Sequence, residues 1–141
     1  MALNKVFDIA GSAMNAQSTR LNTTASNLAN ADSVSGDPGK VYRARNPVFE
    51  SVPSFGQALQ DESATVGVRI KGIVESQAPL QQRYSPDHPE ADADGNVYVS
   101  NVNTVEEMVN MLSASRSYQS SVEIMNTTKD LMVQTLSMGR S

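Results

Sequence analysis

The sequence predicts a mainly α protein, in which long N- and C-terminal helices pair as a coiled coil and bracket a small, loop-rich insert that contains β-strands. Two segments with apolar residues at helical spacing lie at the two ends of the chain, and glycine, proline and short alternating runs fill the middle. The expected division is an N-terminal helix over residues 1–31, the insert over 32–103 and a C-terminal helix over 104–141.

The first segment carries apolar or small residues at an alternating spacing of four and three, which predicts a helix with one packing seam over residues 2–31. The seam positions are Leu3, Phe7, Ala10, Met14, Gln17, Leu21, Thr24, Leu28 and Ala31. Polar residues at two of these positions weaken the seam, and the many Asn, Ser and Thr side chains around it compete for backbone hydrogen bonds. We therefore expect this helix to need a packing partner.

The middle segment begins where Gly36, Pro38 and Gly39 end the helical pattern. β-Like runs follow at residues 41–45 and 97–99, and the clearest alternation of apolar and polar residues is at 66–71. Gly72 then shifts the alternation, which indicates a bulge before Ile73 and Val74. Prolines interrupt the later part, so the insert is expected to be small and rich in loops.

The last segment opens with Thr104-Val105-Glu106-Glu107, the pattern of a capping box with Thr104 as the N-cap and Glu107 reaching back to it. Apolar residues at helical spacing follow, and Gly139 provides a stop. The positions are Met108, Met111 or Leu112, Tyr118, Val122, Met125, Met132 and Leu136. This pattern predicts a second long amphipathic helix.

The composition favours a protein that associates. Hydrophobic residues make up 39% of the chain and aromatic residues only 5%, which leaves little material for a compact core. The net charge of −4 argues against nucleic acid as a partner. No apolar run reaches the roughly 18 residues that a membrane span needs, so we expect no membrane insertion. Residues 1–8 do not form a cleaved secretory signal peptide.

Two features invite a catalytic or metal-binding interpretation, and both have a simpler explanation. His88 is the only histidine and lacks a nucleophile motif, so a role in the turn is expected. Glu90, Asp92, Asp94 and Gly95 resemble the beginning of a calcium loop, but Asn101 stands where such a loop needs a bidentate glutamate. We expect no enzymatic activity, no metal and no cofactor.

Several motifs together resemble the flagellar rod and hook protein family, and most closely its proximal rod members. The residues that carry the resemblance are 27–32, 86–92 with Gly95, 101–103 with 107–108, 114–119 and 126–129. They cover nearly the whole chain in the order that the family shows, so the resemblance is specific.

The resemblance implies a structural subunit of the proximal rod of the flagellar basal body. Such proteins are exported through the flagellar type III apparatus without a cleaved signal peptide. They assemble in the periplasm into a helical tube that transmits torque and forms part of the export channel wall. The implied partners are further copies of the chain, other rod proteins, basal-body ring proteins and the export apparatus.

The functional residues expected from this interpretation lie at subunit interfaces on the two helices. They are Leu21, Leu28, Asn30, Met108, Arg116, Tyr118, Val122 and Met125. A second hypothesis is a secreted coiled-coil adaptor or chaperone-like partner of a type III secretion system. Concentration dependence separates the two, because an adaptor forms a closed oligomer, whereas a rod subunit stays monomeric or grows open-ended assemblies.

Overall fold

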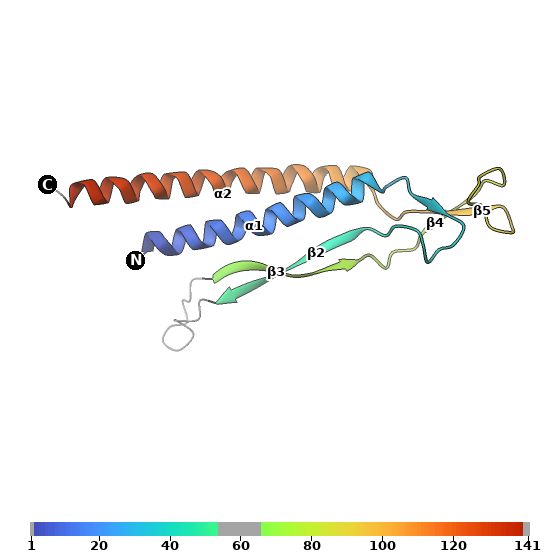
Figure 1. The fold of residues 1–141 in the computed structure, drawn as a ribbon, viewed down its shortest axis with the longest axis horizontal. Coiled ribbons are helices and arrows are strands. Elements are labelled where there is room, and N and C mark those ends of the chain that lie inside the picture. Colours follow the sequence, from blue (N-terminus) through green and yellow to red (C-terminus); the bar gives the residue numbers. More distant parts are fainter. Residues whose placement is uncertain (1, 54–65, 140–141) are drawn as a thin grey trace. The chain divides into compact units, whose positions relative to one another are not determined.

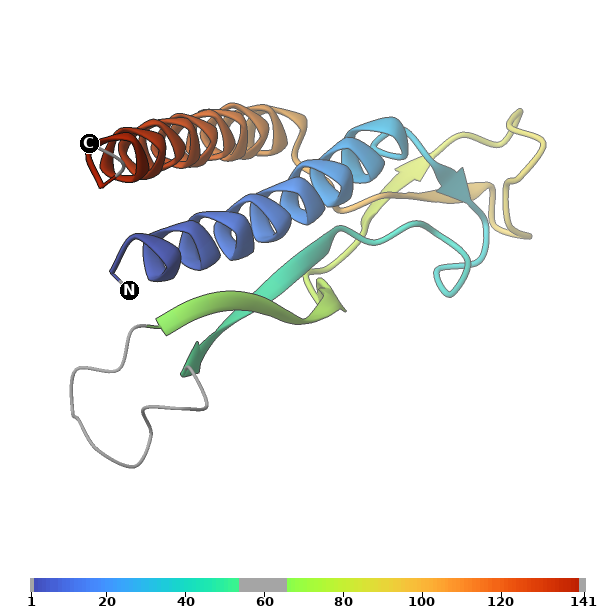
Figure 2. The same cartoon turned by 60° about the vertical axis from the view of Figure 1, so that its left-hand side comes forward.

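The computed structural model describes residues 2–53 and 66–139, which form two long helices and five strands (Figures 1 and 2). In chain order these are α1 (Ala2–Ala29), β1 (Val34–Ser35), β2 (Arg45–Pro53), β3 (Val66–Glu75), β4 (Gln81–Tyr84), β5 (Asn96–Val99) and α2 (Thr104–Met138).

The chain divides into two compact units. Unit 1 takes its described residues from Met1–Thr19, Val48–Gly72 and Ser113–Ser141. Unit 2 consists of Arg20–Pro47 and Ile73–Leu112. The predicted division at residues 31 and 103 stays a prediction.

The prediction of a mainly α fold with coiled-coil pairing is wrong. Helices account for about half of the described residues, and two antiparallel sheets accompany them, so the fold combines α and β structure. The buried helix positions are also unsuited to a coiled-coil seam, because they carry small or polar side chains such as Ala10, Ala16, Ala114 and Ser121. None of the large apolar side chains described on the helices is buried, and several, among them Met108, Leu131 and Leu136, are exposed.

Unit 2 contains a three-stranded antiparallel sheet with the strand order β1-β5-β4. In its register Val34 lies opposite Val99, and Gln82 lies opposite Tyr98. The central strand β5 confirms the run predicted at residues 97–99, and its Val97 is fully buried. The sequence does not predict the two edge strands. β1 has only two residues, and β4 consists of exposed, mostly polar residues, so neither shows the alternation of apolar and polar residues that marks a strand.

β2 and β3 form a two-stranded ribbon. Arg45 pairs with Glu75 near one end and Glu50 pairs with Arg69 further along, so the strands run in opposite directions. β3 extends the predicted run at 66–71 through Gly72 to Glu75. The strand predicted at residues 41–45 is wrong, because β2 begins only at Arg45, where that run ends.

In unit 1 the segments of α1 and α2 lie side by side and run in opposite directions in both views (Figures 1 and 2). A β-carbon added to Gly11 would lie 3.7 Å from Cε of Met125, at ordinary contact distance. The ribbon is attached to α1 through Ser12, whose hydroxyl oxygen accepts the amide hydrogen of Val68 at 3.2 Å. The same hydroxyl donates to the carbonyl of Ile9 at 2.8 Å, so Ser12 joins the strand to the helix backbone.

The start of α2 differs from the predicted capping box. The side-chain oxygen of Asn103 accepts hydrogen bonds from the amides of Val105 and Glu106, at 3.1 and 3.3 Å. Asn103 is therefore the N-cap, and Thr104 is the first helical residue. The predicted reaching-back residue, Glu107, is buried with 6% of its surface exposed.

Candidate functional site

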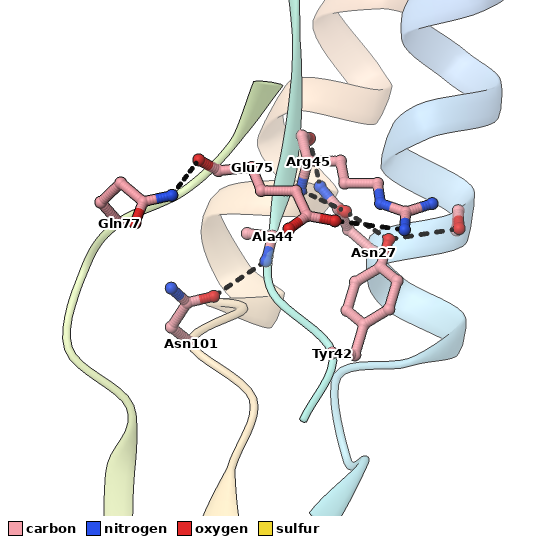
Figure 3. Close-up of polar contacts among 8 residues, drawn as sticks. Asn27, Tyr42, Ala44, Arg45, Glu75, Gln77 and Asn101 are labelled. Carbon is pink, nitrogen blue, oxygen red and sulfur yellow. Dashed lines mark hydrogen bonds and ion pairs between the residues drawn. The ribbon is translucent and has the colours of Figure 1, made fainter. Parts of the chain in front are cut away.

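A buried polar cluster lies in unit 2, between the C-terminal part of α1 and residues 42–45 (Figure 3). Asn27 is 1% exposed, and its side-chain amide donates to the carbonyl of Arg45 at 2.9 Å. Its oxygen accepts the amide hydrogen of Arg45 and the hydroxyl of Tyr42, both at 2.9 Å. One side chain thus satisfies the N–H and the C=O of the same residue, as a neighbouring strand would. We call Asn27, Tyr42 and Arg45 the Asn27 cluster.

Asn101 holds the same chain segment from the other side (Figure 3). Its oxygen accepts the amide hydrogen of Ala44 at 2.8 Å, and its nitrogen donates to the carbonyl of Ala78 at 3.0 Å. Arg43 donates to the carbonyls of Ser76 and Ala78 as well, at 3.2 and 3.1 Å. Two asparagines far apart in the sequence, one near the end of α1 and one before α2, therefore fix residues 42–45 in place. This arrangement gives a structural reason for the asparagines in the motifs at 27–32 and 101–103.

The acidic segment at residues 87–94 is a structural turn. One carboxylate oxygen of Asp92 accepts the amides of Asp94 and Asn96, at 3.0 and 2.8 Å, which is the side-chain-to-backbone bonding expected of such turns. His88 accepts the amide of Glu90 through Nδ1 at 3.1 Å. No group of three or more His, Cys, Asp or Glu side chains suited to a metal ion occurs within residues 2–53 and 66–139.

Gly36, which directly follows β1, allows this turn to pack closely against the backbone there. A β-carbon added to Gly36 would overlap the carbonyl oxygen of Glu90 and lie 3.0 Å from the amide nitrogen of Asp92. Gly95 closes the turn with a φ of 77°, a conformation that favours glycine. The segment 86–95 is therefore a loop that packs its backbone against Gly36, and a side chain at position 36 would displace it.

The first two turns of α2 expose an apolar face. Four side chains follow the helical spacing i, i+3, i+4 and i+7, so they share one side of the helix. They are Val105, Met108, Val109 and Leu112, with exposed fractions of 70%, 61%, 63% and 56%. We call these four residues the α2 N-terminal patch. A contiguous apolar patch on the surface of a folded unit is typical of an interaction site.

A second apolar feature lies in the unit 1 segment of α2. Ile124 and Leu131 are seven residues apart, so they stand on the same side of the helix, and each is 46% exposed. Two exposed carboxylates, Glu123 and Asp130, directly precede them. We call Ile124 and Leu131 the α2 C-terminal stripe.

Small residues occupy the buried side of α2, and the two hydroxyl-bearing ones form hydrogen bonds within the helix. Ser121 and Thr128 donate to the carbonyls of Ser117 and Ile124, at 3.0 and 2.8 Å. Burying them therefore leaves no unpaired hydroxyl. Together with Ala114 they recur every seven residues, and this close-packing side leaves the larger side chains outside.

The structure distributes the predicted interface residues over several positions. Met108 belongs to the α2 N-terminal patch. Arg116 is exposed and follows Leu112, the last residue of that patch, by four positions. Five others are half-buried, namely Leu21, Leu28, Tyr118, Val122 and Met125. Asn30 is half-buried and donates to the carbonyl of Ser26 at 2.8 Å. Tyr118 and Val122 line a shallow groove on α2 together with Glu123, Asn126 and Asp130.

Sequence reasoning missed the residues that expose the most apolar surface near the start of α2. Val105 and Val109 are not among the predicted interface residues, although the i, i+3, i+4, i+7 spacing of the α2 N-terminal patch is visible in the sequence. The sequence predicts the methionines on the buried side of this helix, whereas the structure places Glu107 and Ala114 there. Neither described helix is long and apolar enough to span a membrane.

Comparison with known proteins gives matches at both ends of the chain and over its full length. A family model described as flagella basal body rod protein matches residues 7–36, and one described as flagellar basal body rod FlgEFG protein C-terminal matches residues 93–138. The flagellar basal-body rod protein FlgC of Salmonella typhimurium (strain LT2) is 53% identical over 140 residues, which cover 99% of this chain and 100% of that protein.

More distant relatives carry the same name. FlgC of Yersinia enterocolitica is 51% identical over 140 residues, again covering 99% of this chain and 100% of the relative. FlgC of Buchnera aphidicola subsp. Acyrthosiphon pisum is 41% identical over 138 residues, covering 98% of each chain. The likeness therefore includes both helices and the segment between them.

Proposed function

The chain belongs to the family of flagellar basal-body rod proteins and is a structural subunit of that rod, and we propose that it occupies the proximal part. There its copies join a helical tube that transmits torque and forms part of the export channel wall. The observation that carries this proposal is the full-length identity to rod proteins of one name, 53% for the Salmonella typhimurium relative.

The surface of α2 supports a role in assembly. The four side chains of the α2 N-terminal patch are more than half exposed, although small residues of the same helix are buried. Leaving large apolar side chains in water is unfavourable, so such a surface suits a protein whose neighbours cover it. The interface residues proposed from the sequence are Leu21, Leu28, Asn30, Met108, Arg116, Tyr118, Val122 and Met125.

The buried polar clusters support the transmission of force. The Asn27 cluster and Asn101 tie the end of α1, residues 42–45 and the segment before α2 into one unit with directed hydrogen bonds. Satisfied buried polar networks hold one geometry and resist rearrangement, which suits a part that must stay rigid under torque.

The partners that we propose are further copies of the chain, other rod proteins, the basal-body rings and the flagellar type III export apparatus. We place the subunit in the basal body, where it crosses the periplasm after export without a cleaved signal peptide. The secreted-adaptor hypothesis loses its support, because the full-length relatives are named as rod proteins.

Electron microscopy of basal bodies from a strain that lacks the gene tests the proposal. Rings without a rod are expected, and a plasmid copy of the gene should restore the rod and the hook. Complete rods and hooks in the deletion strain would refute the proposed function.

A further inference from the structure

The β2–β3 ribbon has residues in both compact units. Its base lies in unit 2, where the buried side chain of Asn27 binds the N–H and the C=O of Arg45. Its other described residues, 48–53 and 66–72, belong to unit 1, and we call them the ribbon arm. One end of the ribbon is therefore held by buried hydrogen bonds, and the arm depends on separate contacts within unit 1.

The ribbon arm docks on α1 at Ser12. A β-carbon added to Gly67 would lie 3.2 Å from the hydroxyl oxygen of Ser12 and 3.7 Å from its β-carbon. The same hydroxyl accepts the amide hydrogen of Val68 at 3.2 Å. A side chain at position 67 would press against Ser12, so a glycine there allows the strand to come this close to the helix.

The contact at Ser12 can separate at little cost. The Ser12 hydroxyl donates to the carbonyl of Ile9 at 2.8 Å, and this bond within α1 remains when the arm leaves. The amide of Val68 can then bond to water, so neither group loses all its partners. The ion pairs in the part of the chain that the structure describes join Lys40 with Asp37 and the two strands of the ribbon with each other, so none of them ties the arm to a helix.

The arm also buries little of its apolar surface in the docked position. Val48 and Phe49 are 37% and 39% exposed, and Val52, Val68 and Ile70 are half-buried. None of the apolar side chains described in the arm is buried. Segments with few buried apolar contacts open at a low free-energy cost, so the arm can leave α1 without unfolding of the helices.

We propose that the ribbon arm is a movable element, which is docked on α1 in the free subunit and is released from it when the subunit enters the rod. This inference rests on the proposed function and adds a conformational step to it. Val48 and Phe49 lie partly in water in the docked state, which is unfavourable. A neighbouring subunit that covers them better than the docked position does shifts the equilibrium toward release.

A disulfide between the arm and α1 tests the release, because the chain contains no other cysteine. The distance of 3.7 Å between the β-carbon of Ser12 and one added at Gly67 lies in the range that disulfides need. A strain produces the subunit with Ser12→Cys and Gly67→Cys as its only copy. The matched control carries Ser12→Cys with Gly67→Ser, whose side chain is similar in size but cannot form the bond.

The readouts are swimming and the presence of rods in purified basal bodies, and mass spectrometry of peptides reports the disulfide. We expect the disulfide to form in the oxidised free subunit and the locked subunit to give neither rods nor swimming, whereas the control gives both. Rods that contain the intact disulfide would overturn the proposal while leaving the proposed function intact. Thiols that stay unpaired in the oxidised free subunit would overturn it too, because the docked state would then be absent.

Gly67→Val provides a second test that needs no disulfide. The valine side chain would crowd Ser12 and keep the arm away from α1, so hydrogen exchange at the Val68 amide should become faster. Because the released arm is the assembled form, rods should still be present. Loss of rods in this variant, with both helices intact by circular dichroism, would show that the rod needs the docked arm and would refute the release.

Discussion

Replacement of Asn27 by alanine tests whether the Asn27 cluster stabilises unit 2. The change removes three hydrogen bonds of 2.9 Å from a side chain that is 1% exposed. At about 0.5–1.5 kcal/mol each, their loss sums to roughly 1.5–4.5 kcal/mol. The better helix propensity of alanine returns about 0.5 kcal/mol. We therefore expect the free energy of unfolding to fall by about 1–4 kcal/mol.

Stability is measured by urea unfolding, with far-UV circular dichroism as the signal. Hydrogen exchange is measured at the Arg45 amide, which donates to the side-chain oxygen of Asn27. Asn22→Ala is the matched control, because it makes the same substitution on the same helix at an exposed position. It should not reduce stability. If Asn27→Ala cost no more than Asn22→Ala and the Arg45 amide kept its protection, the reasoning would be refuted.

Tyr42→Phe separates the contributions within the cluster. This variant removes the hydroxyl that donates to Asn27 and that also forms a hydrogen bond of 3.2 Å with the Ser26 hydroxyl, so the expected loss is about 1–2 kcal/mol. Because the two substitutions remove the same hydrogen bond, the double variant should lose less stability than the sum of the single variants. Additive losses would mean that the two side chains act independently.

The remaining predictions concern the turn, the cap of α2 and the attachment of the ribbon. Gly36→Ala should destabilise the protein by about 1–3 kcal/mol in thermal unfolding, because the new β-carbon meets backbone; Gly72→Ala meets no atom within 4 Å and should be neutral. Asn103→Ala should lower the free energy of unfolding by about 1 kcal/mol, because the helix cap is lost. An equal loss of stability in Thr104→Ala would argue against Asn103 as the N-cap of α2. Ser12→Ala should speed hydrogen exchange of the Val68 amide, which donates to the Ser12 hydroxyl in the native protein. Unchanged exchange at Val68 would contradict this prediction.

Much of the function could be inferred from the sequence because its motifs lie on short, local structures. The segments 27–32, 86–95 and 101–103 each include a helix end, a turn or a cap that forms within a few positions of the chain, as the hydrogen bonds of Asn30, Asp92 and Asn103 do. Both long helices were also predicted, and they begin and end within a few residues of the expected bounds. Patterns of this kind are local, so one sequence contains them in full.

The side of each helix that is buried could not be read from the sequence. Hydrophobicity favours Met108 and Leu112 as packing residues, yet the structure buries Glu107 and Ala114 and leaves those larger side chains exposed. The usual inference fails here because it assumes that a single chain covers its own apolar surface. In a protein that assembles, neighbours can cover that surface instead.

The sequence by itself determined the two helices, the central strand β5 and membership of the rod family, because each depends on local spacing or on motifs in a fixed order. Only the tertiary structure decided the α and β character of the fold, the roles of Asn27 and Asn101, and the separation of small buried residues from large exposed ones. These features depend on contacts between residues far apart in the chain, such as Asn27 with Arg45 and Asn101 with Ala44. No periodicity within a single segment specifies them.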